Sequence, residues 1–194
     1  SDSDIDADAD ADTDADTDSD TTASYQVIDI ATGSFHTCVV LDGGGVKCWG
    51  SNQFGTLGYP TDESLCTGST PDTCPFVEVG GSVSQIDGGR YHTCALLESG
   101  EVKCWGYAWG PGSICYGVLG PGVAVSESGW TDDPLATSTV SLGTTVSMLS
   151  TNDSHSSVLT ASGNVVTWGC SYNPHVSMSE VTADPPSTPK TGQS

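Results

Sequence analysis

A stretch that occurs twice is the strongest constraint on the fold of this 194-residue chain. The sequence HTCVVLDGGGVKCWG, residues 36–50, returns almost unchanged as HTCALLESGEVKCWG at residues 92–106. A weaker third copy keeps His155 and Trp168 in the same register. The histidines are separated by 56 and then 63 residues, inside or just above the range of blade-like repeats. We therefore expect three copies of one unit, at approximately residues 26–59, 76–120 and 135–173, within a segment 23–178.

Each copy has the pattern of short strands joined by tight turns. In copy one TCVVL and VKCWG flank DGGG, and in copy two TCALL and VKCWG flank ESGE. Glycine or a small polar residue supplies the positive φ that such turns need. Further candidate strands lie upstream of the hairpins: QVIDIAT, VSQIDG and VSMLST, and also PFVEV or LATSTVSL before copies two and three. Four short antiparallel strands per repeat, apolar on both faces, predict an all-β fold of stacked β-propeller blades.

The first cysteine pair lies across a predicted hairpin. If Cys38 opposes Cys48, then Val40 opposes Val46, because the two pairs of residue numbers have equal sums. Directly opposed residues on an antiparallel pair lie within the Cα separation that a disulfide requires. We therefore predict a disulfide between Cys38 and Cys48.

The second copy repeats this arrangement, and the third copy tests it. Cys94 opposes Cys104 by the same arithmetic. In copy three the equivalent positions hold Ser157 and Thr167, so both cysteines are absent together. A joint loss is expected for a bonded pair and not for two independent thiols. We therefore predict a disulfide between Cys94 and Cys104 as well.

The remaining four cysteines lie in insertions. Cys66 and Cys74 bracket TGSTPDT, a loop that a local disulfide would close. Cys115 and Cys170 each follow a Trp-Gly pair, on copies two and three, and adjacent blades would bring these loops together. We predict both pairs as disulfides.

The cysteine spacing also bears on metal binding and on the cellular compartment. The chain has eight cysteines and no CxxC pair, and 9, 7 and 9 residues separate the members of the three nearest pairs. Zinc sites need closer thiolate or imidazole ligands. Cytosolic proteins rarely carry so many cysteines without a metal. We therefore expect an oxidising compartment, with the chain at the cell surface or outside the cell.

Residues 30–58, IATGSFHTCVVLDGGGVKCWGSNQFGTLG, resemble a repeat of the regulator of chromosome condensation family. Copy one matches that signature through Gly33, His36, Trp49, Gly50, Asn52, Gly55, Leu57 and Gly58. Copy two matches through Gly89, His92, Trp105, Gly106 and the YGVLG of residues 116–120, and copy three through His155, Gly163, Trp168 and Gly169. The resemblance implies a β-propeller, usually of seven blades, a fold that hosts exchange factors, inhibitors, adhesins and surface proteins. Cysteine-bridged members preceded by Asp/Thr runs resemble bacterial surface proteins.

Three blades do not close a ring by themselves, since closed propellers need four or more. Either the chain is part of a larger ring or its open edges pair with other copies, because an exposed sheet edge is a template for strand addition. We expect a non-enzymatic extracellular structural or adhesive protein that associates with itself, as a homo-oligomer or a fibre subunit. The alternative is a fragment of a closed seven-bladed secreted protein that recognises another protein. Another surface protein or a glycan is a further candidate partner.

Charge and motif content argue against two other classes of function. The net charge is −21, and no basic stripe is present that could bind a phosphate backbone, so nucleic-acid binding is not expected. The chain has no GxSxG or HExxH motif, and DGGG is a turn and not a phosphate-binding loop. No apolar run is long enough to span a bilayer. His36, His92 and His155 occupy one place on three different blades, so we expect structural histidines, each hydrogen-bonded to nearby backbone, and no catalytic residue.

An acidic low-complexity arm, residues 1–22, precedes the repeats, and a Pro/Thr-rich tail, residues 179–194, follows them. In an extended arm the carboxylates of Asp2, Asp4, Asp6, Asp8, Asp10, Asp12, Asp14, Asp16, Asp18 and Asp20 share one face. A solvated tether is one interpretation; bound calcium, packing on a neighbouring subunit, or glycans are the others. The candidate glycosylation sites are Thr13, Thr17, Thr21, Thr22 and Asn152, the last within an Asn-Asp-Ser acceptor sequence.

Overall fold

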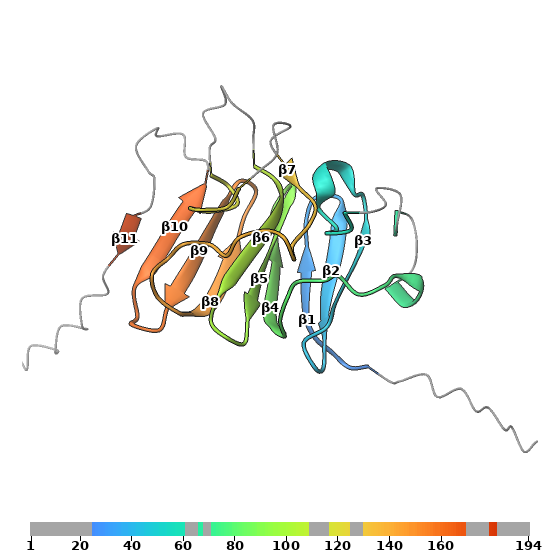
Figure 1. Ribbon diagram of the computed structural model, residues 1–194, viewed down its shortest axis with the longest axis horizontal. Coiled ribbons are helices and arrows are strands. Elements are labelled where there is room, and N and C mark those ends of the chain that lie inside the picture. Colours follow the sequence, from blue (N-terminus) through green and yellow to red (C-terminus); the bar gives the residue numbers. More distant parts are fainter. Residues whose placement is uncertain are drawn as a thin grey trace, which may run out of the picture.

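Three antiparallel sheets stand side by side in the computed structural model, in the order of the sequence (Figure 1). The structure describes residues 25–60, 66–67, 71–108, 117–124, 130–169 and 179–181. These residues contain strands and two single-turn 3₁₀ helices, η1 (Gln53–Gly55) and η2 (Pro71–Thr73). The all-β, blade-like fold expected from the repeats is therefore confirmed, and no helix among the described residues is long and apolar enough to cross a membrane.

Each sheet, which we call a blade, corresponds to one copy of the repeat. Blade 1 consists of β1 (Val27–Thr32), β2 (His36–Leu41) and β3 (Val46–Gly50). Blade 2 consists of β4 (Val83–Gly88), β5 (His92–Leu97), β6 (Val102–Tyr107) and β7 (Trp130–Thr131). Blade 3 consists of β8 (Val146–Thr151), β9 (His155–Thr160), β10 (Val165–Gly169) and β11 (Ser179–Val181). The strands of each blade pair in sequence order.

The central hairpins have the register that the cysteine spacing predicts. Cys38 lies opposite Cys48, and Val40 lies opposite Val46. In blade 2 the same register places Cys94 opposite Cys104. The turn of the first hairpin closes through Gly43 and Gly44, whose φ angles of 92° and 81° lie in the left-handed region that glycine tolerates best.

The blades are stacked through their inner strands, with β1 beside β4 and β4 beside β8. A bulge interrupts the pairing of each inner strand at the equivalent place, between Val27 and Asp29 in β1 and between Val83 and Gln85 in β4. A bulge re-aims the side chains next to it. The bulges therefore help to direct side chains of the inner strands into the joints between blades.

Two hydrophobic clusters fill the joints. The first contains Cys38, Val40, Val46 and Cys48 of blade 1 together with Val83, Ile86, Ala95, Leu97 and Trp105 of blade 2. The second contains Cys94, Leu96, Val102 and Cys104 of blade 2 together with Val146, Leu149, Val158 and Trp168 of blade 3. One face of a blade thus packs on the opposite face of the next blade, and this buried apolar area is the main stabilising contribution.

The outer connections differ from the sequence prediction. The segments PFVEV and LATSTVSL were expected as strands of copies two and three, yet each contacts the preceding blade. Val77 forms an isolated bridge with Val46 of blade 1, and Val140 N donates to Val102 O of blade 2 at 2.8 Å. Each is a single ladder contact, because the chain must leave the outer edge at once to reach the inner strand of the next blade.

A repeated lysine fixes these connections to the blades. Lys103 is buried, and its Nζ donates to Pro134 O at 2.9 Å and to Leu135 O at 3.2 Å. Lys47, the equivalent residue in blade 1, donates to Pro71 O at 3.2 Å and lies over the Phe76 ring. The carbonyls satisfy ammonium groups that would otherwise be costly to bury.

Candidate protein-binding surfaces

The register histidines join neighbouring blades. His36 Nε2 of blade 1 lies 2.9 Å from Thr93 Oγ1 of blade 2, and His92 Nε2 of blade 2 lies 3.2 Å from Ser156 Oγ of blade 3. Thr93 gives its own hydroxyl proton to Thr56 O at 2.9 Å, so His36 Nε2 must be the donor to Thr93. The prediction of backbone partners is wrong for these two rings, because each ring meets a hydroxyl side chain of the next blade.

Burial governs the protonation of these two histidines. It lowers the pKa of His36 to about 4. It lowers the pKa of His92 to about 3, with a further contribution from the neighbouring histidines. Both rings are therefore neutral in the folded protein at neutral pH. Among the described residues no group of His, Cys, Asp and Glu is placed to hold a metal ion.

Stability should fall on acidification because of these histidines. Both histidines are protonated near pH 6.5 in the unfolded chain, but only near pH 4 and below in the folded chain. Their contribution to the free energy of unfolding is therefore fully present above pH 6.5. It is lost as the pH falls through that window, by about 2–3 kcal/mol for His36 between pH 7 and 4. Urea unfolding of His36→Gln at several pH values should give a flatter profile than the unaltered chain. His155→Gln is the matched control, because the ring of His155 has no hydrogen bond across a described joint, and identical profiles for both variants would refute the assignment.

The register tryptophans make the reverse contact, to the preceding blade. Trp105 Nε1 donates to Thr56 O of blade 1 at 3.1 Å, and Trp168 Nε1 donates to Val118 O of blade 2 at 3.1 Å. Both carbonyls belong to the loops GTLG and GVLG that follow a Trp-Gly pair. Trp49 has no preceding blade among the described residues and is only partly buried. The motif residues are therefore contacts between blades.

Side chains of the inner strands also clamp the backbone of the next blade. Asp29 Oδ2 accepts a hydrogen bond from Ile86 N at 2.8 Å. Gln85 Oε1 accepts one from Leu149 N at 2.9 Å, and Gln85 Nε2 donates to Leu149 O at 2.7 Å. By repeat spacing the clamp position is held by Asp29, Gln85 and Met148, and the receiving position by Ile30, Ile86 and Leu149.

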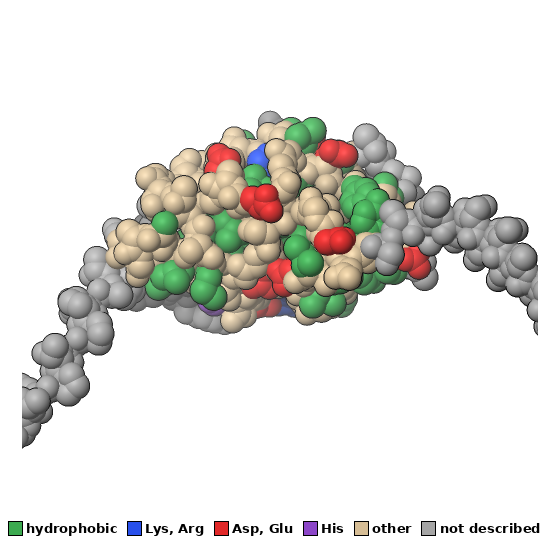
Figure 2. Space-filling model, turned by 90° about the horizontal axis from the view of Figure 1, so that it is seen from below, with side chains coloured by type: hydrophobic (Ala, Val, Ile, Leu, Met, Phe, Trp, Pro, Cys, Tyr) green, Lys and Arg blue, Asp and Glu red, His purple; other side chains and the backbone are tan. Residues whose placement is uncertain are grey.

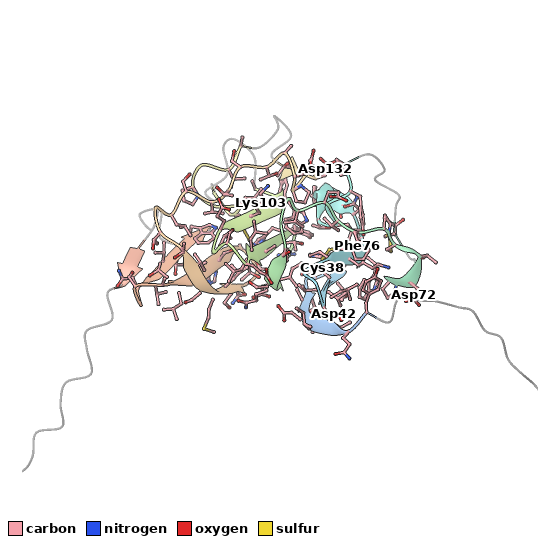
Figure 3. All side chains as sticks on the ribbon, turned by 60° about the horizontal axis from the view of Figure 1, so that its bottom comes forward. Cys38, Asp42, Asp72, Phe76, Lys103 and Asp132 are labelled. Carbon is pink, nitrogen blue, oxygen red and sulfur yellow. A yellow bond between two sulfur atoms is a disulfide. The ribbon has the colours of Figure 1, made fainter. Side chains whose placement is uncertain are left out.

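The three disulfides among the described residues are the pairs expected from the sequence: Cys38–Cys48, Cys94–Cys104 and Cys66–Cys74. The first two have no exposed surface, because the next blade covers them. In blade 3 a hydrogen bond of 2.9 Å between Ser157 and Thr167 takes the place of the disulfide. Figure 3 shows Cys38 inside the molecule and Asp42 and Asp72 at its periphery.

The face of blade 1 that has no neighbour exposes large apolar side chains on β1. Val27 is 57% exposed, whereas its equivalents Val83 and Val146 are 1% and 6% exposed. Ile30 is 61% exposed, whereas Ile86 and Leu149 are 2% and 3% exposed. The inner strand of blade 1 therefore carries the residues that a preceding blade would bury.

Blade 3 shows the complementary feature on its own free face. Val165 is 37% exposed, although its equivalents Val46 and Val102 are each 1% exposed. Met148, at the clamp position, is 58% exposed. Seen from below, hydrophobic side chains gather on the right, where Figure 1 places β1 and β3, and a smaller group lies on the left, toward β8 and β10 (Figure 2). We call the exposed apolar surface around Val27 and Ile30 the β1 face, and the one around Met148 and Val165 the β8 face.

An aromatic cluster lies where η1 of blade 1 meets blade 2. The rings of Phe54 and Tyr107 have centroids 4.5 Å apart, and the rings of Phe54 and Tyr91 5.3 Å. Phe54 adopts a φ of 69°, a conformation that non-glycine residues rarely take. Arg90 covers the Tyr91 ring and pairs with Asp153 of blade 3 at 3.9 Å. The rings join blades 1 and 2, and Phe35, stacked on Tyr91, is largely exposed.

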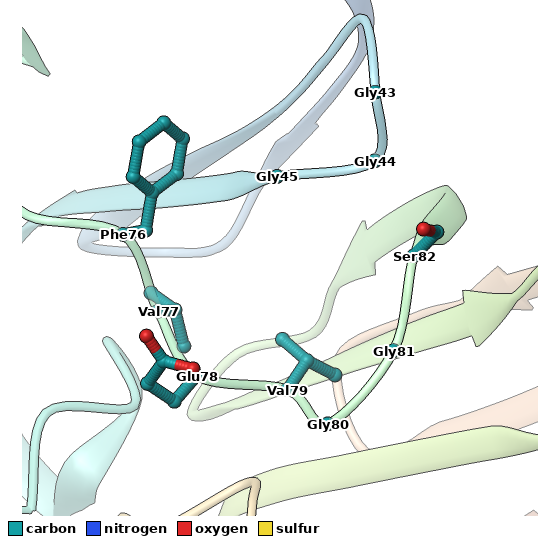
Figure 4. A pocket seen from close by; sticks show the side chains of 10 residues that line it. All are labelled: Gly43, Gly44, Gly45, Phe76, Val77, Glu78, Val79, Gly80, Gly81 and Ser82. Carbon is teal, nitrogen blue, oxygen red and sulfur yellow. The ribbon is translucent and has the colours of Figure 1, made fainter.

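Two of the shallow hollows on the described part of the chain lie between blades. One, of about 340 Å³, separates the Gly43–Gly45 turn from the segment Phe76–Ser82 (Figure 4). The other, of about 500 Å³, is formed by residues 32–34, 87–90 and 151–153. The carboxylate of Asp87 in the second hollow accepts hydrogen bonds from the backbone amides of Gly88 and Thr151.

Several predicted site residues lie outside the described residues. These are the ten aspartates of the arm, Thr13, Thr17, Thr21, Thr22, Cys115 and Cys170. Asn152 is described and exposed, as a glycosylation acceptor would be. Thr93, Ser156 and the clamp residues are not among the site residues that the sequence predicts. The recurrence of Thr37, Thr93 and Ser156 at the repeat spacing is the signal that points to them.

Stacked antiparallel blades of three or four strands, with their inner strands side by side, define a β-propeller repeat protein. Models of the "Regulator of chromosome condensation (RCC1) repeat" match residues 27–56 and 83–110 in one form and residues 44–96 in another. The chain belongs to the regulator of chromosome condensation repeat family.

Relatives and solved structures agree with this assignment. The chain is 31% identical to protein pim1 of Schizosaccharomyces pombe over 154 residues, covering 76% of this chain and 28% of that protein. It is 30% identical to the regulator of chromosome condensation of Drosophila melanogaster over 145 residues, covering 75% and 24%. The chain thus spans about a quarter of the length of these relatives.

Solved structures share the fold. Human WBSCR16 superposes with a TM-score of 0.58 at 22% identity, covering 75% of this chain and 34% of that one. Prp20p of Saccharomyces cerevisiae superposes with a TM-score of 0.57 at 21% identity, covering 77% and 32%, and is described with its binding properties to Gsp1p and histones. Yeast RCC1 (Prp20) has also been solved bound to Kap60. Propellers of this family thus include proteins that bind other proteins.

Proposed function

We propose that this chain is a non-enzymatic extracellular protein, structural or adhesive, that binds protein and associates with itself. The observation that carries the proposal is the exposure of Val27 and Ile30 on β1, at positions that blades 2 and 3 bury in joints. Contiguous apolar surface of this kind marks a site of protein association. Protein binding by relatives such as Prp20 supports the same class of function.

The use of reactive side chains supports a non-enzymatic role. His36 and His92 are buried in joints, with hydroxyl partners and lowered pKa values that keep them neutral. Six cysteines are bonded in disulfides and supply no thiolate nucleophile. These groups stabilise the blades, and binding is left to the exposed faces.

The disulfides support an extracellular or cell-surface location. Such bonds persist in oxidising compartments and are rare where thioredoxin and glutathione keep thiols reduced. For the acidic arm, residues 1–22, we propose calcium as the counterion of its ten aspartates, because carboxylate oxygens are the ligands this cation prefers. Glycans on the arm threonines fit the same location.

Self-association should be visible in the size distribution of the purified chain. We expect sedimentation velocity across a concentration series to show species larger than a monomer, with a concentration dependence typical of reversible association. Electron microscopy of the concentrated sample should show whether these species are fibres. Parallel runs with calcium and with a chelator test whether the arm contributes. A single monomeric species at all concentrations would count against the proposal.

A second candidate function is that of one part of a larger propeller that recognises another protein. The observation that favours it is the length relation: the chain spans 28% of pim1 and 32% of Prp20p. Further blades would then cover the β1 and β8 faces. The same sedimentation experiment separates the candidates, because a strictly monomeric chain favours this one.

A further inference from the structure

We infer that copies of this chain join head to tail, with the β8 face of one copy against the β1 face of the next. This inference rests on the proposed self-association and assigns its interface. Blades 1 and 2 each pack one face on the blade that follows, and blade 3 leaves the equivalent face exposed. Blades 2 and 3 each pack the opposite face on the blade that precedes, and blade 1 leaves that face exposed. A second copy supplies both missing neighbours at once, in the order already used twice within the chain.

The position of contact follows from the two internal joints. In both joints the clamp position of one blade reaches the receiving position of the next, as Gln85 reaches Leu149. At the joint between copies the clamp position is Met148 and the receiving position is Ile30. The internal geometry therefore places the exposed Met148 of one copy on the exposed Ile30 of the next.

Met148 and Ile30 are both apolar, whereas the internal joints use a polar side chain at the clamp position. Ile86 N and Leu149 N each take their acceptor from the preceding blade. Ile30 N is instead satisfied within blade 1, by Asp29 Oδ1 at 2.9 Å. The joint between copies thus needs no polar clamp, and blade 3 offers none, because an apolar methionine holds that position.

Further apolar residues surround this contact. Val165 and the half-buried Leu159 of blade 3 occupy the places of Val46 and Val40, which pack against Val83 and Ile86 inside the first joint. The equivalent of Val83 in blade 1 is Val27, which is exposed. The joint between copies is therefore an apolar contact along the hairpin-turn half of the inner strands.

The other half of the joint is less complete. A Cβ added to Gly33 or Gly89 would overlap the histidine ring of its own blade and would also lie 2.6 Å from a carbonyl of the next blade. In blade 3 this position is Asn152, which has a Cβ. Asn152 therefore holds this half of the joint apart. His155 and Thr37, the equivalents of the His36–Thr93 pair, are consequently left without that hydrogen bond.

The experiment uses two variants of the full chain, each with one face blocked. Ile30→Glu places a charge on the β1 face and Met148→Glu places one on the β8 face, and both sites are exposed enough for the fold to be kept. An unpaired carboxylate in the joint should weaken self-association of each variant at least about 100-fold. Leu135→Glu is the matched control. Leu135 is exposed and lies on an outer connection, so this substitution adds the same charge away from both faces.

The decisive measurement is sedimentation velocity on a mixture of the two blocked variants. A head-to-tail joint leaves one intact β8 face and one intact β1 face on different molecules. The mixture should therefore form a 1:1 dimer and no larger species. Asn152→Gly should act in the opposite direction and tighten association of the unaltered faces by about tenfold, since it allows the His155–Thr37 hydrogen bond.

Each other outcome has a definite meaning. If all three Glu variants associate like the unaltered chain, self-association stands but uses another surface, and the head-to-tail assignment is wrong. If Met148→Glu alone still dimerises, the joint pairs two β1 faces and the assignment is again wrong. If the unaltered chain is monomeric, the proposed self-association itself fails.

Discussion

Replacing Trp105 by alanine is expected to lower the free energy of unfolding by about 3–5 kcal/mol, the usual cost of removing a buried tryptophan. The side chain has no exposed surface and its Nε1 donates to Thr56 O of the preceding blade. The change leaves a cavity in the first joint and an unsatisfied carbonyl beside it. Equilibrium urea unfolding followed by far-ultraviolet circular dichroism measures this loss without using tryptophan fluorescence.

Trp49 provides an internal control for that prediction. It holds the same motif position in blade 1 but is only partly buried, and no preceding blade contacts it among the described residues. Trp49→Ala should therefore cost less, about 1–2 kcal/mol. Equal losses for the two variants would show that the tryptophans stabilise their own blades and not the joints.

Exchanging Cys94 and Cys104 for serine and threonine is expected to destabilise the protein by about 2–3 kcal/mol, the chain-entropy value for a loop of this length. The exchange copies Ser157 and Thr167, which hold the same places in blade 3. In blade 2, however, the pair is fully covered by the next blade, so two hydroxyl groups would also be buried. Urea unfolding under non-reducing conditions measures the difference.

The reverse exchange in blade 3 is the matched test. Ser157 and Thr167 are directly opposed, as Cys38 and Cys48 are in blade 1. The double change to Ser157→Cys and Thr167→Cys should form a disulfide and raise stability by an amount of similar size. Failure of the new thiols to oxidise would mean that blade 3 departs from the geometry of the other two blades.

The fold within each blade could be predicted from the sequence because it depends on local pairing. The position of Cys38 relative to Cys48 determines the register of the hairpin, and Val40 then lies opposite Val46. The joint loss of both cysteines in copy three identified the bond without any structure. Turn residues and strand periodicity act over a few residues, and this makes such inferences reliable.

The contacts between blades could not be predicted in the same way. Thr93 lies 57 residues from His36, and the hydrogen bond between them exists only because two sheets pack at a particular offset. Asp29 likewise binds the backbone of Ile86, and backbone groups carry no sequence signal. The outer segment at Val77 was assigned to the wrong neighbour, because a single bridge is too short to show a strand pattern.

The disulfides Cys38–Cys48 and Cys94–Cys104, covered completely by the following blade, impose an order on maturation. An oxidant must reach the sulfur atom that it attacks, so each bond has to form while its hairpin is still open to solvent. Hairpin closure and oxidation therefore precede stacking. A cell in which stacking outpaces oxidation would trap reduced thiols beneath the next blade, so the supply of oxidant is part of the folding pathway.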